Sequence, residues 1–314
     1  MRKSLLLVGL LLALGISAAQ AASTRTAESP IVRLGIKHIG HGSKTAKTGP
    51  LVLHSSATQG AVSPSPAVYL VFWGSQWGDS THAGAGDPAG AASALQTFFA
   101  HLYGSADTWG TILSQYCEGL PAGTTSCNGL GTPVVHPATS LLPAGHVWFD
   151  NSAAAPAKAT TGQIAAEAAN AAAHFGNTSQ VPNLNAQYVI ASPSGTHPDG
   201  FPKTGFCGWH SKTNAGAAGT IAFTNLPYVP DLPAGACTTL TSPGPLDGYF
   251  STETHEYAET VTDFWPSSGW LSTGGLEIGD LCESLDNTLT LAGTRFDVQG
   301  LWSNSTGKCV TSSP

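Results

Sequence analysis

The residues with the clearest chemical potential are His255-Glu256-Tyr257-Ala258-Glu259. This stretch differs from the metalloprotease signature H-E-x-x-H at one position, because Glu259 stands where the second histidine would be. On a helix, residues four apart lie on one face with Cβ atoms about 5–6 Å apart, so His255 and Glu259 could bind one divalent ion. Glu256 would lie beside that ion and could act as the general base that takes a proton from water.

A second acidic pair follows where a third ligand would be needed. Glu277 and Asp280 form an E-x-x-D pattern, and 17 residues separate Glu277 from Glu259. In thermolysin-like (gluzincin) proteases a glutamate at comparable spacing is the third ligand, and an aspartate three residues later holds the first histidine by its other ring nitrogen. We therefore expect His255, Glu259 and Glu277 to bind the metal. Asp280 would orient His255, although Glu277 and Asp280 could exchange these roles.

Glutamate in place of the second histidine changes the chemistry of the predicted site. One histidine with two carboxylates is more anionic than two histidines with one glutamate. The added negative charge would raise the pKa of a bound water, and it would admit Mn²⁺ or Ca²⁺ as alternatives to Zn²⁺. The other interpretation is an ordinary acidic, solvated helix that binds no ion.

Two further residues could have a role at or near this site. His210, in the stretch Gly205–Asn214, could stabilise an oxyanion during catalysis, although a histidine close to Cys207 could equally be structural. Asp263 lies two turns beyond His255, about 12 Å along a helix axis, so we expect it to make a structural contact at the helix end. No G-x-S-x-G pattern indicates a serine nucleophile.

Alternating strands and helices should position these residues. The helix that carries the motif should span 244–264 and end before Pro266. Apolar runs and helical spacing predict strands at 66–74, 145–150, 185–193 and 219–229, and further helices at 88–104, 106–117 and 160–177. Pro227 suggests that 219–229 is an edge strand, whose residues 219–225 could bind a substrate backbone by strand addition. The fold class predicted is α/β (α+β): a zincin-like mixed sheet with packing helices, as a single domain over 66–314.

The N-terminal residues predict export. Arg2 and Lys3 precede a short apolar run and the Ala19-Gln20-Ala21 site, so residues 1–21 are interpreted as a signal peptide. No later apolar run reaches the roughly 20 residues that a membrane span requires. Residues 22–65 are rich in small polar residues and are predicted to be a flexible tail or a propeptide. The protein should therefore be secreted and extracellular, or periplasmic.

Six cysteines fit the same compartment. An even number in an exported chain predicts three disulfides, and six cysteines allow 15 connectivities. Pairing in chain order would close three modest loops, and its last bridge, Cys282–Cys309, would hold the C-terminal segment. No C-x-x-C pattern is present, which disfavours a cysteine-based zinc site.

The charge balance excludes one class of partner. The chain has a formal net charge of −7 and only 10% charged residues, and loss of the predicted signal would remove two of its 12 basic residues. Nucleic-acid binding needs clustered lysine and arginine, which this sequence lacks. The expected partner is a polypeptide substrate, and the expected state is a monomer.

Five short blocks resemble the phosphate-induced protein 1 / EXORDIUM family of secreted proteins, and its bacterial branch most closely. They are YLVFWGSQW, KTGFCGWHS, THEYAETVTD, EIGDLCE and RFDVQGLWSNSTGKC, in family order between about 68 and 309. The resemblance implies secretion and one domain. Plant members are extracellular and have no established enzymatic activity, whereas this sequence keeps the complete set of predicted site residues.

Two functional hypotheses follow. The first is a secreted metal-dependent endopeptidase in which Glu256 is the general base. The second is a non-catalytic extracellular protein, like the plant relatives, whose acidic cluster holds a structural ion or none.

Overall fold

The computed structural model describes residues 31, 33–38, 48–57, 59–104, 107–134 and 140–313. The predicted signal peptide at 1–21 lies outside these residues, as does part of the tail predicted over 22–65. The described residues from Ile31 onward belong to one compact unit.

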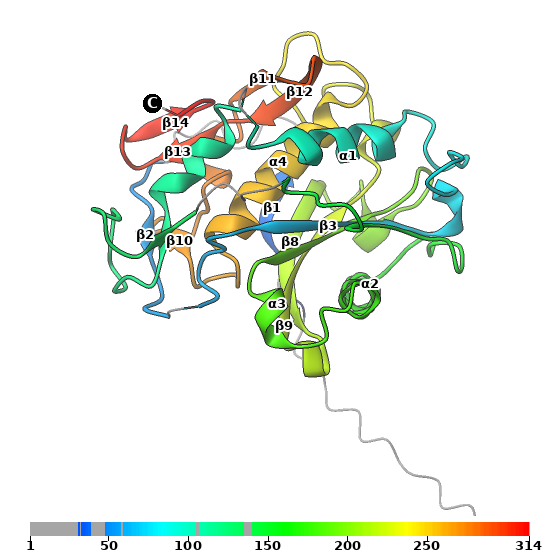
Figure 1. The fold of residues 1–314 in the computed structure, drawn as a ribbon. Coiled ribbons are helices and arrows are strands. Elements are labelled where there is room, and N and C mark those ends of the chain that lie inside the picture. The colour runs from blue at the N-terminus through cyan, green and yellow to red at the C-terminus, as the bar shows by residue number, and fades with distance from the viewer. Residues whose placement is uncertain are drawn as a thin grey trace, which may run out of the picture. The chain divides into compact units, whose positions relative to one another are not determined.

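A six-stranded mixed sheet forms the centre of this unit (Figure 1). Its strand order is β1-β8-β9-β7-β3-β6. The four strands from β9 to β6 run parallel, whereas β8 pairs antiparallel with β9, and β1 pairs antiparallel with β8. The strand bounds are β1 Leu34–His38, β3 Ala67–Trp73, β6 Val147–Asp150, β7 Ala186–Ala191, β8 Phe206–Asn214 and β9 Thr220–Leu226. The predicted mixed α/β class is thus confirmed at the level of the sheet.

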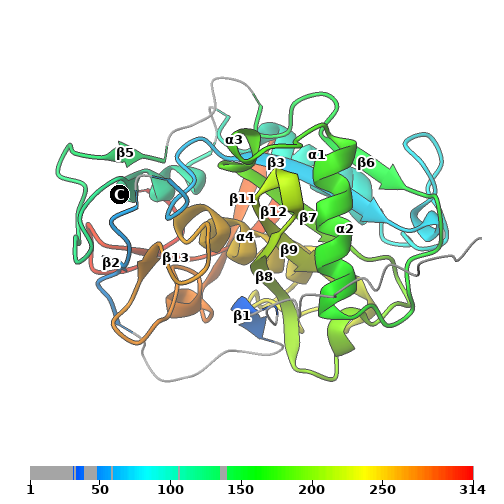
Figure 2. The ribbon, with the colours of Figure 1, turned by 90° about the horizontal axis from the view of Figure 1, so that it is seen from below.

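Helices cover both faces of the sheet. α1 (Ala91–His101) and α4 (Asp247–Thr262) lie on one face, and α2 (Thr161–His174) lies on the other (Figures 1 and 2). Alternate residues of β3 point to opposite faces of the sheet. Its even-numbered residues pack in the core that includes α1 and α4, and its odd-numbered residues pack in the core that includes α2. Burial on both faces explains why this strand is a continuous apolar run.

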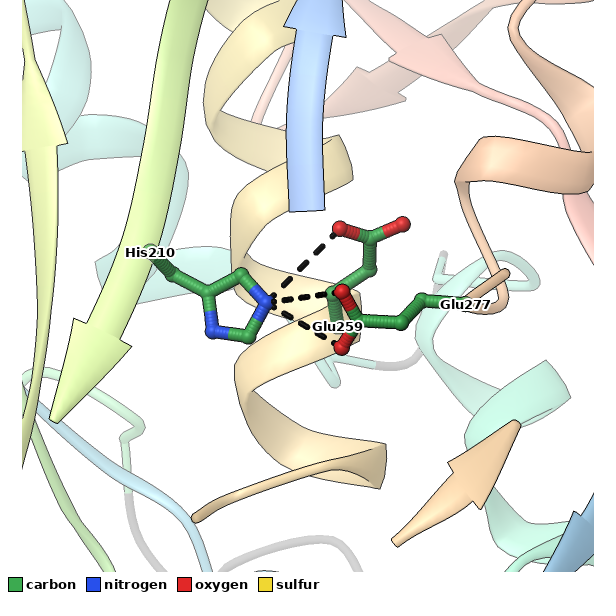
Figure 3. Close-up of side chains that lie close together, drawn as sticks. All are labelled: His210, Glu259 and Glu277. Carbon is green, nitrogen blue, oxygen red and sulfur yellow. Dashed lines mark hydrogen bonds and ion pairs between the residues drawn. The ribbon is translucent and has the colours of Figure 1, made fainter. Parts of the chain in front are cut away.

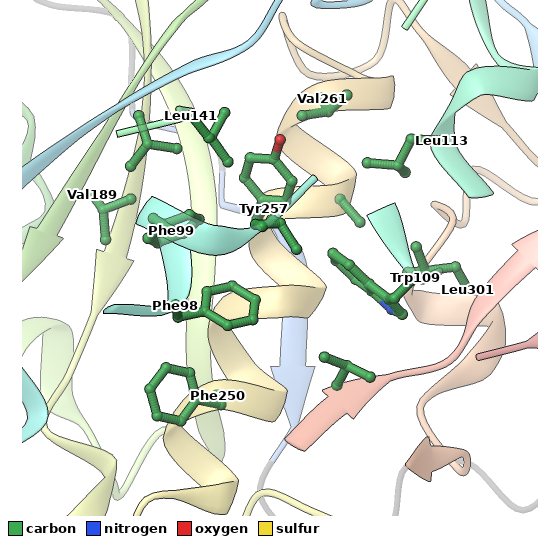
Figure 4. Close-up of a cluster of buried hydrophobic side chains, with 14 of the residues drawn as sticks. Phe98, Phe99, Trp109, Leu113, Leu141, Val189, Phe250, Tyr257, Val261 and Leu301 are labelled. Atoms are coloured by element: carbon green, nitrogen blue, oxygen red, sulfur yellow. The ribbon is translucent and has the colours of Figure 1, made fainter. Parts of the chain in front are cut away.

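α4 is buried along its whole length. Its apolar residues Phe250, Tyr257 and Val261 lie in the core with Phe98 and Trp109 (Figure 4). His255, Glu256 and Glu259 on the same helix are also completely buried. Buried charged groups are costly unless they are paired or bind an ion, so this helix must be explained by its polar contacts as well as by its apolar ones.

The C-terminal segment adds short hairpins over α4. Gln299 ends the strand β12, which packs on α4. The remaining elements are α3 Gln180–Asn183, β2 Val52–Leu53, β4 Cys117–Glu118, β5 Thr132–Pro133, β10 Trp270–Leu271, β11 Asp286–Leu291, β12 Thr294–Gln299, β13 Leu301–Ser303 and β14 Lys308–Val310, with 3₁₀ turns that include Gly110–Gln115 and Asp280–Cys282.

The disulfides pair in chain order, as predicted: Cys117–Cys127, Cys207–Cys237 and Cys282–Cys309. Three bridges are typical of exported proteins. Within the described residues, no helix has both the length and the apolar character needed to cross a bilayer.

Three predictions about elements are wrong. Residues 219–229 are not an edge strand, because β9 lies between β7 and β8, and Pro227 comes just after its last paired residue. Ordered structure begins before residue 66, with β1 and β2. The helix predicted over 106–117 is a 3₁₀ turn at Gly110–Gln115, whereas the Thr160 cap predicted for α2 forms a complete capping box with Gln163.

Candidate metal centre

His255 and Glu259 lie one turn apart on α4, as their spacing predicts. His255 Nε2 is 3.1 Å from Glu259 Oε2, and both side chains are fully buried. The second oxygen, Glu259 Oε1, accepts hydrogen bonds from the backbone N–H groups of Gly279 (3.1 Å) and Asp280 (2.8 Å). These bonds hold the carboxylate in place and leave Oε2 facing the two histidines.

His210 enters the same cluster from β8, the strand beside α4 (Figure 3). Its Nε2 is 3.1 Å and 3.2 Å from the two carboxylate oxygens of Glu277, and 3.8 Å from Glu259 Oε2. His210 was predicted as an oxyanion-stabilising residue, but its imidazole faces two predicted metal ligands. It is therefore a candidate ligand itself.

Two overlapping sets of residues could hold a metal ion. One is His210, Glu259 and Glu277, and the other is His255, Glu256 and Glu259. In each set the ligand atoms lie within 4.8 Å of one another, and Glu259 belongs to both. Sequence reasoning missed the second histidine of the centre because His210 is 67 residues away from Glu277 along the chain.

Asp280 does not take the orienting position predicted for it, and its alternative role as a metal ligand stays a prediction. The other ring nitrogen of His255, Nδ1, lies 3.0 Å from Gln299 Oε1. Asp280 Oδ1 lies on the opposite side of the ring, 3.9 Å from His255 Nε2. Gln299 also donates from Nε2 to the carbonyl oxygen of Gly279, at 2.9 Å. Gln299 therefore takes the orienting position, while Asp280 borders the centre.

Gly279 allows this close packing. A Cβ atom at Gly279 would lie 2.8 Å from His255 Nδ1 and 2.9 Å from Glu259 Oε1, closer than Cβ atoms come to other atoms. Glycine between Glu277 and Asp280 is thus required for the loop to approach α4. This glycine is the one signal in the sequence that could have indicated contact between the loop and the helix.

Asp263 makes the structural contact predicted for it. Its carboxylate accepts hydrogen bonds from the backbone N–H groups of Ser267, Ser268 and Gly269 after the end of α4. Its side chain also hydrogen-bonds to Glu277, so Asp263 supports a candidate ligand without belonging to either set.

The centre concentrates ionisable groups away from water. Burial, reinforced by the charge of Glu259, raises the pKa of Glu256 and of Glu277 well above the usual range. Burial and the neighbouring Glu259 raise the pKa of Asp280 to about 6. Burial lowers the pKa of His210 to about 3; for His255 burial acts in the same direction, but the charge of Glu259 outweighs it and raises the pKa.

Several of these atoms make no hydrogen bond of acceptable geometry, although His255 Nε2 and Glu259 Oε2 face each other at 3.1 Å. They are His255 Nε2, Glu256 Oε2 and Glu259 Oε2, all buried. Two imidazoles and carboxylate oxygens are the ligands that zinc and similar divalent ions accept. A cation would pair these atoms and offset the mutual repulsion of the carboxylates, so the residues present fit such an ion.

The centre is covered by β1. The backbone N–H of Lys37 donates to Glu256 Oε1 at 3.3 Å, and Lys37 Nζ donates to Gln299 Oε1. One oxygen of Glu256 is therefore held by β1, while the other is left without a partner beside His255 and Glu259.

Chemically, the arrangement offers a buried ligand set for one divalent cation and a carboxylate beside it that could accept a proton. Comparisons of this chain with protein-family models, with curated proteins and with solved structures find no match. The EXORDIUM resemblance therefore remains a prediction from the sequence.

Proposed function

We propose that the protein is a secreted metal-dependent endopeptidase of zincin-like layout, with zinc as the expected ion. One observation carries the proposal: two buried sets of possible ligands, His210 with Glu277 and His255 with Glu256, meet at the shared residue Glu259. Mn²⁺ or Ca²⁺ remain alternative occupants because the set is rich in carboxylates.

Each residue has a distinct part in the proposed reaction. Three of the four ligand candidates would hold the ion and leave one position for water; the ion would supply Lewis acidity toward the peptide carbonyl and lower the pKa of that water. Glu256 Oε2 would take the proton from that water and pass it to the leaving amine. Gln299 would keep His255 oriented, and the surrounding protein would exclude other water from the buried centre.

A second candidate function is supported by the burial of the centre. Both histidines and Glu259 have no exposed surface, and β1 lies against Glu256. Structural zinc sites have all positions closed, whereas catalytic sites keep one open. A non-catalytic extracellular protein with a structural ion would have this closed arrangement permanently.

The two functions differ in what Glu256→Gln changes. We expect purified protein to contain stoichiometric metal by elemental analysis and to cleave casein. Glu256→Gln should keep the metal while cleavage falls by about 10²–10⁴, as expected for loss of a general base. Since β1 covers Glu256, each form is also assayed with Lys37→Ala, which removes the side-chain anchor of that strand.

The matched control is Glu253→Gln, the same change one turn earlier on the same buried helix and outside both ligand sets. This variant should cleave casein as the wild type does. Metal-loaded protein that leaves casein intact, with and without Lys37→Ala, would exclude the peptidase and favour the structural site.

A further inference from the structure

β1 is the outermost strand of the sheet on the β8 side, and it lies beside the candidate metal centre. Leu34 is paired with His210 and Lys37 with Gly208, in antiparallel register. In Figure 3 β1 is the blue arrow whose starting end lies near the labelled side chains. Since His210 is a candidate ligand, whatever occupies this edge of the sheet lies against the reactive residues.

The contact of β1 with Glu256 is made by the backbone. Lys37 donates its main-chain N–H to Glu256 Oε1. Any extended polypeptide laid along β8 in this register would offer the same kind of donor at the same place. Recognition by strand addition works in this way, because main-chain hydrogen bonds supply affinity and side-chain pockets supply specificity.

The Lys37 side chain occupies such a pocket. Only 2% of the residue is exposed, and its Nζ donates to Gln299 Oε1. A buried ammonium group is costly without polar partners, and the Gln299 amide oxygen supplies one here. The next residue, His38, is bound by Glu283, with Nδ1 and Oε1 2.9 Å apart. The body of the protein thus presents polar and acidic groups to two consecutive basic residues.

The remaining strands form a sheet without β1. β8, β9, β7, β3 and β6 pair continuously, and β1 is added at the outer edge of β8. Its pairing is irregular, with register shifts on both sides of Lys37. Arg33 adds one further tie, an ion pair with Asp199. These contacts hold β1 against the outer edge of β8.

We propose that the β8 edge, with Gln299 and Glu283, is a binding groove for an extended polypeptide that carries a lysine, and that β1 occupies it as an internal substitute. The groove would make the full chain partly latent, so that it cleaves more slowly than a chain without β1 in place, since substrate and β1 compete for one edge. The identification of the occupant as substrate rests on the proposed peptidase function, whereas the existence of the groove does not.

Tethering makes β1 a strong competitor. A segment joined to its site by a short linker has an effective concentration in the millimolar range. A free peptide at micromolar concentration therefore cannot displace β1 unless the contacts of β1 are weakened. This difference can be measured without any catalytic activity.

The test uses the full chain and a fluorescein-labelled peptide with the sequence of residues 31–38. Lys37→Pro removes both the N–H that Glu256 accepts and the ammonium group, so β1 should leave the groove. By fluorescence anisotropy the peptide should bind Lys37→Pro at least tenfold more tightly than the wild type. Lys37→Ala, which keeps the N–H, should give a smaller gain and serves if the proline variant does not fold. Lys308→Ala, a change at an exposed lysine on β14, should bind as the wild type does.

The lysine pocket is tested with a second peptide in which alanine replaces Lys37. It should bind the Lys37→Pro protein at least tenfold more weakly than the native peptide. Equal binding of the native peptide to the wild type and to both Lys37 variants would overturn the groove. Equal binding of the two peptides would overturn the lysine pocket.

A casein assay on the same proteins separates this inference from the proposed function. Peptide binding by Lys37→Pro without casein cleavage would leave the groove standing and reject the peptidase. Casein cleavage at equal rates by the wild type and Lys37→Pro, with equal peptide binding, would support the peptidase and reject the latent groove.

Discussion

At the residue scale, Gln299 determines which nitrogen of His255 can bind an ion. Its Nε2 donates to the Gly279 carbonyl, so its Oε1 must face His255. An amide oxygen can only accept, and His255 must therefore carry its proton on Nδ1. The lone pair of Nε2 is then free toward Glu259 and the centre. Gln299 does for His255 what Asp280 was predicted to do.

Replacing Gln299 should weaken metal binding while the ligands stay in place. We expect Gln299→Met to lower zinc affinity about 10- to 100-fold, the usual effect of losing a partner that orients a ligand. Affinity is measured by competition with a chromophoric chelator. Gln96→Met on α1 removes a glutamine outside the centre and should leave the affinity unchanged. An unchanged affinity in Gln299→Met would show that His255 needs no such partner.

Residue-scale prediction succeeded where the interaction is local. The i, i+4 relation of His255 and Glu259 depends only on a helix, and α4 spans Asp247–Thr262 inside the predicted 244–264. The orienting partner of His255 is 44 residues away in sequence, on a strand whose packing no local pattern describes. Its identity therefore required the fold.

At the element scale, α4 and α2 show two ways of burying acidic residues. α4 gathers its carboxylates into a centre that an ion could pair, whereas α2 buries a single one, Glu167. Asn170 donates to Glu167 Oε2 at 3.2 Å, and Oε1 has no partner. Burial, reinforced by the charge of nearby Asp150, raises the pKa of Glu167 to about 7, although the hydrogen bond from Asn170 acts in the opposite direction.

This carboxyl should make stability depend on pH. Its pKa is higher in the folded than in the unfolded chain, so its contribution is fully present below about 4.5 and is lost as pH rises through about 7. Glu167→Gln removes the charge and should raise the free energy of unfolding at pH 8.5 by about 1–2 kcal/mol, with little change at pH 4.5. Urea unfolding at both pH values measures this. An equal effect at the two values would contradict the assigned cause.

Element types were predicted best where a long periodic pattern and a capping residue agree. Thr160 and Gln163 form the capping box that begins α2. β8 was not predicted, because Gly208 and the polar residues at its C-terminal end interrupt the pattern of a strand. Its residues are held by pairing on both sides, with β9 and β1, which local propensity does not encode.

At the scale of the whole molecule, the centre joins segments that are far apart in the chain. β8, α4, the loop before Asp280–Cys282 and β12 all contribute a residue to it. An ion bound there would link these segments in the folded state only. Binding free energy would then become folding free energy.

Zinc should therefore raise the melting temperature. At a free concentration about 1,000 times the dissociation constant, the stabilisation is about 4 kcal/mol. For a chain of this size that corresponds to a shift of about 8–16 °C. Differential scanning fluorimetry with zinc and with a chelator measures the shift, and Glu259→Gln should abolish most of it. If zinc raised the melting temperature of the wild type and of Glu259→Gln equally, the ion would have to bind at another site.

The sequence by itself determined the features that depend on neighbouring residues and on composition. These are α4 with His255 and Glu259 one turn apart on it, the capping box of α2, the mixed α/β class and the number of disulfides. Their physical causes act within about one helical turn or along one strand. The candidate ligands His255 and Glu259 could be named on that basis alone, whereas Glu277 was named from the spacing found in gluzincin proteases.

Only the tertiary structure decided which distant residues meet. Strand order brings His210 to Glu277, the C-terminal hairpin brings Gln299 to His255, and edge pairing brings Lys37 to Glu256 over 219 residues of sequence. Such contacts follow from how whole elements pack, and many sequences with the same local patterns could pack differently. The predicted edge strand failed for this reason: Pro227 marked the end of β9, and the order of the sheet placed that strand inside.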